Sequence, residues 1–227
     1  MMMIDKEFER YVYDEIVPRY ADFDLAHRED HAMTVIREAI NLASGLSAWI
    51  RSQDSVDDVW KEPINPSVLL AAASYHDLGM INGRELHHMH SGEIIRNDVN
   101  LRRWFSESEI ETIAQAAEDH RASSTSAPRS IYGMIVAEAD RVIDGETIIR
   151  RTIQFGFKHY PGFAREDHIL RAVDHLREKY GRGGYLKLWI PWSENSRRLS
   201  ELQDIIADDE AVLKVTSQMY DQLKSLI

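Results

Sequence analysis

The 227-residue chain contains no cysteine, which excludes disulfides, thiolate zinc sites and cysteine nucleophiles. It also lacks any run of about 18 consecutive apolar residues, the length that a membrane-spanning helix needs. The first nine residues carry acidic side chains where a secretory signal would carry basic and then apolar ones. These absences predict a soluble cytoplasmic protein that has no membrane partner.

Basic side chains are scarce relative to acidic ones. The chain has 27 Lys and Arg against 38 Asp and Glu, and its formal net charge is −11. Proteins that bind duplex DNA or RNA gain affinity by neutralising phosphates, so this balance argues against that class. A small phosphorylated substrate is still compatible, because it needs only a metal ion and a few arginines.

Apolar residues recur at helical rather than alternating spacing along most of the chain, which predicts an all-α fold. Ser106, with Glu109 three places later, predicts a capping box at one helix start. The glycine-rich segment 181–184 predicts a turn, and a short β excursion could follow near 184–190. The predicted helices cover 5–17, 27–44, 67–77, 90–99, 107–120, 130–155, 164–180 and a closing amphipathic segment from about 198.

The adjacent pair His76-Asp77 follows an apolar helical run and precedes Gly79. An imidazole and a carboxylate at the end of a buried helix can bind the same divalent cation. A histidine stabilised by the helix C-terminus is the alternative. His31 and Asp140 are further candidate ligands for such a cation. Asp140 lies in an otherwise apolar helical stretch, where an unpaired carboxylate is costly. Arg141 is a poor partner for it, since sequence neighbours on a helix point apart.

The order His31, His76-Asp77, Asp140 resembles the HD superfamily of metal-dependent phosphohydrolases, whose pattern is His…His-Asp…Asp on a core of about five helices. The resemblance covers roughly residues 25–150. It implies an HD-type metal-binding domain over 1–160, with a C-terminal helical extension over 161–227 packed on the same domain. It also implies that these four residues hold a divalent metal ion.

Two more histidines resemble ligands of the bimetallic branch of that superfamily. His88 lies four residues before Gly92, as in a His-x-x-x-Gly element, and His120 lies where those members carry their next ligand. By this analogy Asp77 bridges to a second ion held by His88 and His120. The alternatives are a solvated cluster of histidines over 87–90 and an exposed His120 at a helix end. Mixed histidine and carboxylate ligation suits one or two ions of Mn, Fe, Ni, Co or Mg.

The chain departs from several branches of this superfamily. The lysine that many bimetallic relatives carry shortly after His-Asp is absent, because Gly79 and Met80 stand there. The Glu-Asp pair of the guanosine-tetraphosphate hydrolases is also missing. So is the Gly-Tyr-Pro signature of the cyclic-dinucleotide branch in the matching region. These departures leave the substrate undefined.

Further residues are candidates for catalysis or substrate binding. Asp77 is expected to be central to catalysis, and Glu118 could serve as a general acid or orient a ligand. His27 could contact the substrate, although a structural role fits equally well. Guanidinium groups bind phosphate in bidentate fashion. The arginines considered for this role, each of which could instead be solvated, are Arg28, Arg84, Arg121 and Arg129.

The resemblance implies a metal-dependent phosphohydrolase that cleaves a small phosphate ester or anhydride, with a nucleotide favoured, by attack of metal-activated water. Two alternatives stay open: a nucleotide-sensing regulatory module with a structural metal, and a di-iron oxygenase on the same scaffold. The closing amphipathic helix offers a surface for a homodimer.

Overall fold

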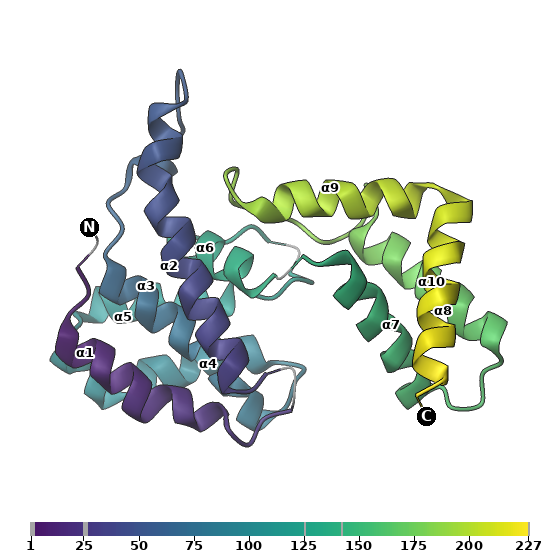
Figure 1. Ribbon diagram of the computed structural model, residues 1–227. Helices are drawn as coiled ribbons and strands as arrows, with labels where there is room; N and C mark the ends of the chain where they lie inside the picture. The colour runs from purple at the N-terminus through teal and green to yellow at the C-terminus, as the bar shows by residue number, and fades with distance from the viewer. Residues whose placement is uncertain (1–2, 25–26, 125, 142, 227) are drawn as a thin grey trace. The chain divides into compact units, whose positions relative to one another are not determined.

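The computed structural model describes residues 3–24, 27–124, 126–141 and 143–226 (Figure 1). Within these ranges there are ten α-helices and no strand, which confirms the predicted all-α class. None of the described helices has the length and apolar character that crossing a membrane requires. The helices are α1 (Lys6–Tyr11), α2 (Glu29–Arg51), α3 (Pro66–Tyr75), α4 (His87–Asn97), α5 (Glu107–Glu118), α6 (Ile131–Asp140), α7 (Gly145–His159), α8 (Arg165–Tyr180), α9 (Glu194–Ala207) and α10 (Asp209–Lys224).

The helices form two compact units. The first contains Met1–Arg141 together with Trp189–Ser193, and the second contains Val142–Leu188 and Glu194–Ile227. The units therefore divide near residue 141, whereas the sequence analysis set its boundary at residue 160. The predicted single helix over 130–155 was wrong, because α6 ends at Asp140 and α7 begins at Gly145. Asp144 starts α7 as its N-cap, and its side chain accepts a hydrogen bond from the Thr147 backbone N at 2.8 Å.

The first unit is built around α3, which packs against α2, α5 and α6. Its residues from Val68 to Tyr75 are all buried, and its alanines let neighbouring helices approach closely. Pro66 occupies the first helical turn, where its missing N–H costs nothing. At the other end, the buried Tyr20 hydroxyl donates to the Ser74 carbonyl at 2.9 Å. The pair His76-Asp77 consequently lies at a buried helix end.

The segment Trp189–Ser193 returns to the first unit. The Trp192 ring lies 4.9 Å from Trp49 and 5.4 Å from Trp60, measured between ring centroids. Its Nε1 donates to the Leu42 carbonyl at 2.8 Å. The backbone N of Trp189 donates to Glu138 Oε2 at 2.8 Å. These contacts anchor Trp189–Ser193 on the α2 and α6 side of the core.

The expected β excursion near 184–190 was wrong. The backbone N atoms of Tyr185 and Leu186 donate to carbonyls of Glu178 and Lys179, at 3.1 and 3.0 Å. The chain therefore uses these donors to close the end of α8 and leaves them unavailable to a neighbouring strand.

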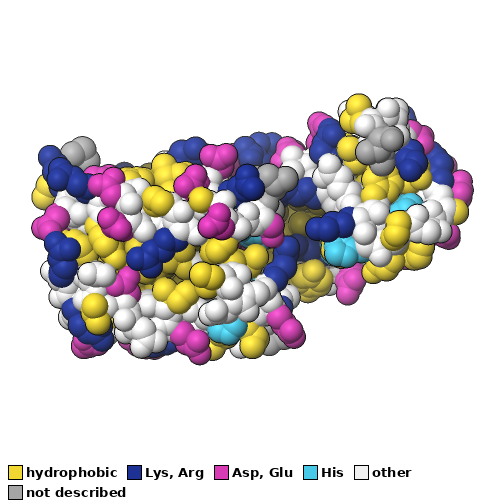
Figure 2. All heavy atoms as spheres, turned by 90° about the horizontal axis from the view of Figure 1, so that it is seen from below, with side chains coloured by type: hydrophobic (Ala, Val, Ile, Leu, Met, Phe, Trp, Pro, Cys, Tyr) yellow, Lys and Arg dark blue, Asp and Glu magenta, His cyan; other side chains and the backbone are white. Residues whose placement is uncertain are grey.

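The second unit consists of α7 to α10, and α7 packs against α8 and α10. The predicted closing helix is two helices, because Asp208 ends α9 and caps α10 through the backbone N atoms of Glu210 and Ala211. On the face drawn in Figure 2, charged side chains of both signs are interspersed with apolar ones.

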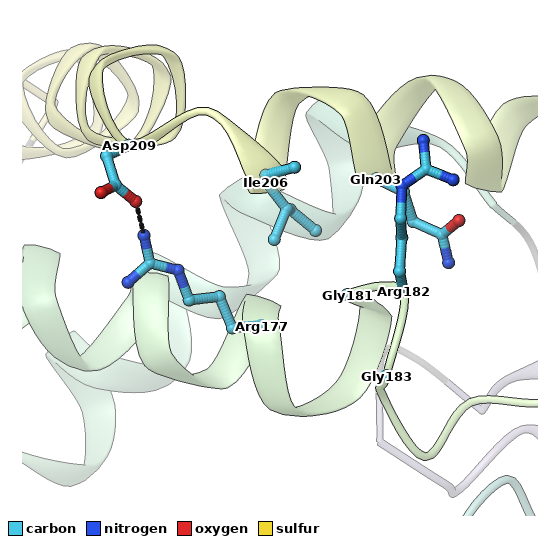
Figure 3. A pocket seen from close by; sticks show the side chains of 8 residues that line it. Arg177, Gly181, Arg182, Gly183, Gln203, Ile206 and Asp209 are labelled. Atoms are coloured by element: carbon cyan, nitrogen blue, oxygen red, sulfur yellow. Dashed lines mark hydrogen bonds and ion pairs between the residues drawn. The ribbon is translucent and has the colours of Figure 1, made fainter.

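Between α8 and the α9–α10 turn lies a hollow of about 300 Å³. Arg177 and Asp209 form an ion pair on one side of it (Figure 3). The lining consists of Arg177, Gly181, Arg182, Gly183, Gln203, Ile206, Ala207 and Asp209. This set contains no histidine, so the hollow lacks the ligand types expected for a metal centre.

Candidate metal centre

The centre is built on the end of α3, where His76 and Asp77 are 0% and 2% exposed. The Nδ1 atom of His76 lies 2.8 Å from the Ala73 carbonyl. Because a carbonyl only accepts, Nδ1 carries the proton and donates it, which leaves the Nε2 lone pair free for a cation. The last turn of α3 therefore fixes both the orientation and the tautomer of this imidazole.

A first group of possible ligands joins α2, α3 and α6. It consists of His31, His76 and Asp140, whose ligand atoms all lie within 4.8 Å of one another. The Nε2 atoms of the two imidazoles are 3.3 Å apart. Asp140 Oδ1 lies 3.2 Å from His31 Nε2 and 3.9 Å from His76 Nε2. Asp140 was expected inside a long helix, but it is the last residue of α6, which directs it toward the end of α3.

A second group joins α3, α4 and α5, and consists of Asp77, His87 and His120. The Nε2 atoms of His87 and His120 are 3.0 Å apart. Their Nδ1 atoms donate to the Arg84 carbonyl at 2.7 Å and to the Ala117 carbonyl at 2.5 Å. Both rings therefore turn their Nε2 atoms toward Asp77.

Asp77 lies between the two groups and presents one oxygen to each. Its Oδ2 is 3.4 Å from His31 Nε2 and 3.3 Å from His76 Nε2. Its Oδ1 is 3.3 Å from the Nε2 atoms of both His87 and His120. Oδ1 is buried and has no hydrogen-bond donor. Each of these two imidazoles donates its Nδ1–H to a backbone carbonyl, so its Nε2 atom presents a lone pair to Oδ1. A carboxylate in this position can bridge two cations.

The residues present fit divalent metal ions. The Nε2 atoms of His31 and His76 lie 3.3 Å apart and those of His87 and His120 lie 3.0 Å apart. Because the His87 and His120 rings both carry their protons on Nδ1, their Nε2 lone pairs repel unless a positive charge lies between them. A proton can supply that charge, but six nitrogen and carboxylate donors in two adjacent groups match the mixed ligation of transition-metal ions. The donor set therefore has both the composition and the orientation of a divalent-metal centre.

The electrostatics of the centre favour bound cations. Burial alone would lower the pKa of His31, but hydrogen bonds to Asp140 and Asp77 outweigh it and raise this pKa to about 10. Burial would raise the pKa of Asp77, but the neighbouring imidazoles of His76, His120 and His31 hold it well below the ordinary range. The pKa of Asp140 is lowered in the same way, chiefly by its hydrogen bond to His31. Both carboxylates are therefore ionised at neutral pH.

The second group contains His87, and the predicted ligand His88 is not part of it. The two residues are consecutive at the start of α4, where side chains are rotated by about 100° from one another, so only one of them can face Asp77. His88 is half-buried, and its ring centroid lies 5.6 Å from that of His87. Burial and the charge of Arg121 lower the pKa of His88 to about 4.

Glu118, a candidate general acid or ligand-orienting residue, and Arg129, a candidate phosphate contact, lie in an ion-pair network at the end of α5. Glu118 is 7% exposed and accepts from Arg96 Nη1 at 2.5 Å and Arg129 Nη2 at 2.6 Å. Burial would raise the pKa of Glu118, but these two arginines lower it. Arg129 also pairs with Asp119 at 2.9 Å. Two carboxylates thus engage the guanidinium that was expected to bind phosphate.

The remaining candidates are His27, Arg121, Arg28 and Arg84, of which His27 contacts the ring of a ligand residue. The His27 ring centroid lies 5.7 Å from that of His31, and its Nδ1 lies 2.7 Å from Asp24 Oδ1. Arg121 follows His120 directly, and its guanidinium donates to Ser123 Oγ at 2.9 Å and to the Glu85 carbonyl. Arg28 and Arg84 are exposed. The Arg28 Nε donates to the Phe23 carbonyl at 3.3 Å.

Three residues of the centre and its supports were missed by the sequence analysis. His87 was one of three clustered histidines, and only the helix phase distinguishes it from His88. Tyr20 lies more than 50 positions before the Ser74 carbonyl that it binds, and no local pattern links the two. Arg96 lies 22 positions before Glu118, which it binds, and no local pattern in the sequence links these two residues either.

Comparison with protein families adds one finding. A family model described as "HD domain" matches residues 28–145, just over half of the chain, and this span contains all six residues of the two groups. Neither the curated proteins nor the solved structures that were compared gave a match.

Proposed function

Since this chain belongs to the HD domain family, whose members are mostly metal-dependent phosphohydrolases, we propose that it hydrolyses a small phosphate ester or anhydride with two divalent ions. The observation that carries the proposal is the pair of ligand groups joined by Asp77, with imidazole Nε2 atoms opposed at 3.0 and 3.3 Å. A nucleotide is the favoured substrate class, by resemblance to the superfamily.

The chain's residues divide the work of holding the ions. His31, His76 and Asp140 would bind one ion, His87 and His120 the other, and Asp77 would contact both. When bound, such ions supply Lewis acidity that makes water nucleophilic near neutral pH and neutralises charge on phosphoryl oxygens. The backbone carbonyls of Ala73, Arg84 and Ala117 keep the imidazoles in the ligating tautomer.

Arg121 is the arginine best placed to contact substrate phosphate. It adjoins His120, and within the described part of the chain no carboxylate lies within ion-pair distance of its guanidinium. Arg28 and Arg84 are exposed and would assist at the rim. His27 would contact the substrate beside His31, with Asp24 holding its ring. A guanidinium free of carboxylates can bind phosphate oxygens without first breaking an ion pair.

The proposal is tested by hydrolysis of a panel of p-nitrophenyl phosphate, bis-p-nitrophenyl phosphate and nucleoside mono- and triphosphates. We expect release of p-nitrophenol, phosphate or pyrophosphate, according to the substrate, that stops in EDTA and returns with Mn²⁺. It should also be lost in Asp77→Ala and kept in Asp204→Ala, an exposed carboxylate of α9.

Three results would contradict this assignment. Turnover that EDTA leaves unchanged would exclude a metal-dependent hydrolase. Intact metal binding without turnover of any substrate would favour a sensing module. Oxygen consumption by the reduced, iron-loaded protein would favour an oxygenase.

A further inference from the structure

The carboxylate of Glu118, at the last residue of α5, lies between two guanidinium groups. Its Oε1 accepts from Arg96 Nη1 at 2.5 Å and its Oε2 accepts from Arg129 Nη2 at 2.6 Å. Glu118 is almost completely buried, so breaking either pair would leave a poorly solvated charge. The Glu118 carboxylate therefore ties both arginines firmly to the end of α5.

Arg129 spans the last turn of α5. Its Nη2 donates to the Gln115 carbonyl at 3.1 Å, and its Nε donates to Asp119 Oδ1 at 3.0 Å. Its backbone N donates to Asp119 Oδ2 at 2.7 Å. The Gln115 carbonyl also accepts from the Asp119 backbone N at 3.0 Å, so Arg129 adds a second donor to it. Arg129 thus contacts residues before and after Ala117.

This turn orients His120. The Ala117 carbonyl accepts the His120 Nδ1 proton at 2.5 Å, and that contact points Nε2 toward Asp77 and His87. The ring can hold this direction only while the Ala117 carbonyl keeps its own. Arg129 therefore bears on the position of His120 without contacting its ring.

Arg96 connects the same carboxylate to α4, the helix that begins with His87. It also binds Glu111 of α5 through Nε and Nη2, at 2.8 and 2.9 Å. Gly92 permits the close approach of the two helices, since a Cβ atom there would lie 2.3 Å from Glu118 Oε1. The helix that begins at His87 and the helix that ends two residues before His120 are thus joined through Arg96, which pairs with both Glu118 and Glu111.

We propose that Glu118, Arg96 and Arg129 form a positioning clamp that sets the separation of His87 and His120 and so maintains the binding site for the second ion. The clamp rests on the proposed function, which requires that ion. None of its three members acts on the substrate. Removing a partner that orients a metal ligand commonly weakens metal binding 10- to 100-fold, and we expect about 10-fold or more on loss of Arg129.

The clamp makes a different prediction from a catalytic role for the same residues. If Glu118 were a general acid, or Arg129 a phosphate ligand, their replacement would change turnover and leave metal affinity in the absence of substrate unchanged. The clamp predicts weaker binding of one ion with no substrate present. Metal affinity is therefore the deciding measurement.

The experiment is a titration of the metal-free full chain with Mn²⁺, in which free Mn²⁺ is followed by its electron paramagnetic resonance signal. The variant is Arg129→Gln, and Arg102→Gln is the matched control. Arg102 pairs with Glu107, which lies on α5 as Glu118 does. Its side chain is 42% exposed against 44% for Arg129. We expect two ions in the wild type and in Arg102→Gln. In Arg129→Gln we expect one unchanged ion and one bound at least 10-fold more weakly, with partial recovery in Arg129→Lys.

Each outcome bears on the clamp. Two ions of unchanged affinity in Arg129→Gln, with circular dichroism like that of the wild type, would overturn it and leave the proposed function standing. Equal weakening of both ions would also overturn it, because the clamp acts on one group of ligands. Fewer than two ions in the wild type would overturn the two-ion function and the clamp together. If Arg129→Gln does not fold, Arg129→Lys and Arg96→Lys carry the same comparison.

Discussion

The assignment of His87, rather than His88, to the second ligand group predicts a clear difference between two neighbouring alanine variants. His87→Ala removes one of three ligands from the group that contains Asp77 and His120, so we expect the second ion to bind at least about 100-fold more weakly, beyond the loss typical of a supporting residue. His88→Ala removes a half-buried ring outside both groups and should leave metal binding intact.

The magnitude follows from linkage between binding and folding. A ligand at 100 times its dissociation constant stabilises the folded state by about 2.7 kcal/mol, and a 100-fold weaker site at the same concentration by only about 0.4 kcal/mol. His87→Ala should therefore lose about 2.3 kcal/mol of metal-dependent stability, which corresponds to roughly 5–9 °C in Tm for a chain of this size.

The assay is thermal unfolding by differential scanning calorimetry with EDTA and with Mn²⁺. The quantity compared is the increase in Tm from EDTA to Mn²⁺ for each variant. Packing lost with either ring lowers the Tm in both conditions and therefore does not enter this increase. We expect His88→Ala to keep the wild-type increment and His87→Ala to lose the part of it that the second ion contributes. The reverse pattern would refute the assignment and return His88 to the ligand set.

Two further predictions concern the support of the centre. Gly92→Ala places a Cβ 2.3 Å from Glu118 Oε1 and should destabilise the protein by about 1–3 kcal/mol, the usual cost of overpacking. Urea unfolding checks this against Gly162→Ala, where an added Cβ meets no atom within 4 Å, and equal effects would contradict it. Hydrogen bonds from Arg96 lower the pKa of Glu111 to about 2. Because the folded-state pKa is depressed, the resulting stability is present above pH about 4.5 and is lost as pH falls toward 2. The unfolding free energy of Glu111→Gln should therefore change less over this range than that of the wild type, and parallel curves would exclude a stabilising role for the pair.

Much of the helical layout could be predicted from the sequence, because amphipathic spacing and capping are local signals. Ser106 and Glu109 form the predicted capping box at the start of α5. The ends of α6 and α9 were missed, since Asp144 and Asp208 cap the following helices within stretches that still show helical periodicity. The β excursion near 184–190 was misread because the backbone N–H groups of Tyr185 and Leu186 close the end of α8, which side-chain alternation does not reveal.

The sequence predicted some residues of the candidate centre and not others. The structure brings His31, His76, Asp77, His120 and Asp140 together, and their order along the chain had already placed them in one hypothesis. The choice between His87 and His88 depends on which side chain of the first turn of α4 faces Asp77. The spacing to Gly92 does not determine this. The network of Arg96, Glu118 and Arg129 brings together side chains from distant parts of the chain, and a single sequence carries no signal for such contacts.

The central claim is that two ions share the carboxylate of Asp77. Electron paramagnetic resonance of the Mn²⁺-loaded protein tests it most directly, because ions bridged by one carboxylate are magnetically coupled. We predict two bound Mn²⁺ per chain with the spectrum of a coupled pair, and loss of that coupling in Asp77→Ala. Fewer than two bound ions, or two ions without coupling, would contradict the account.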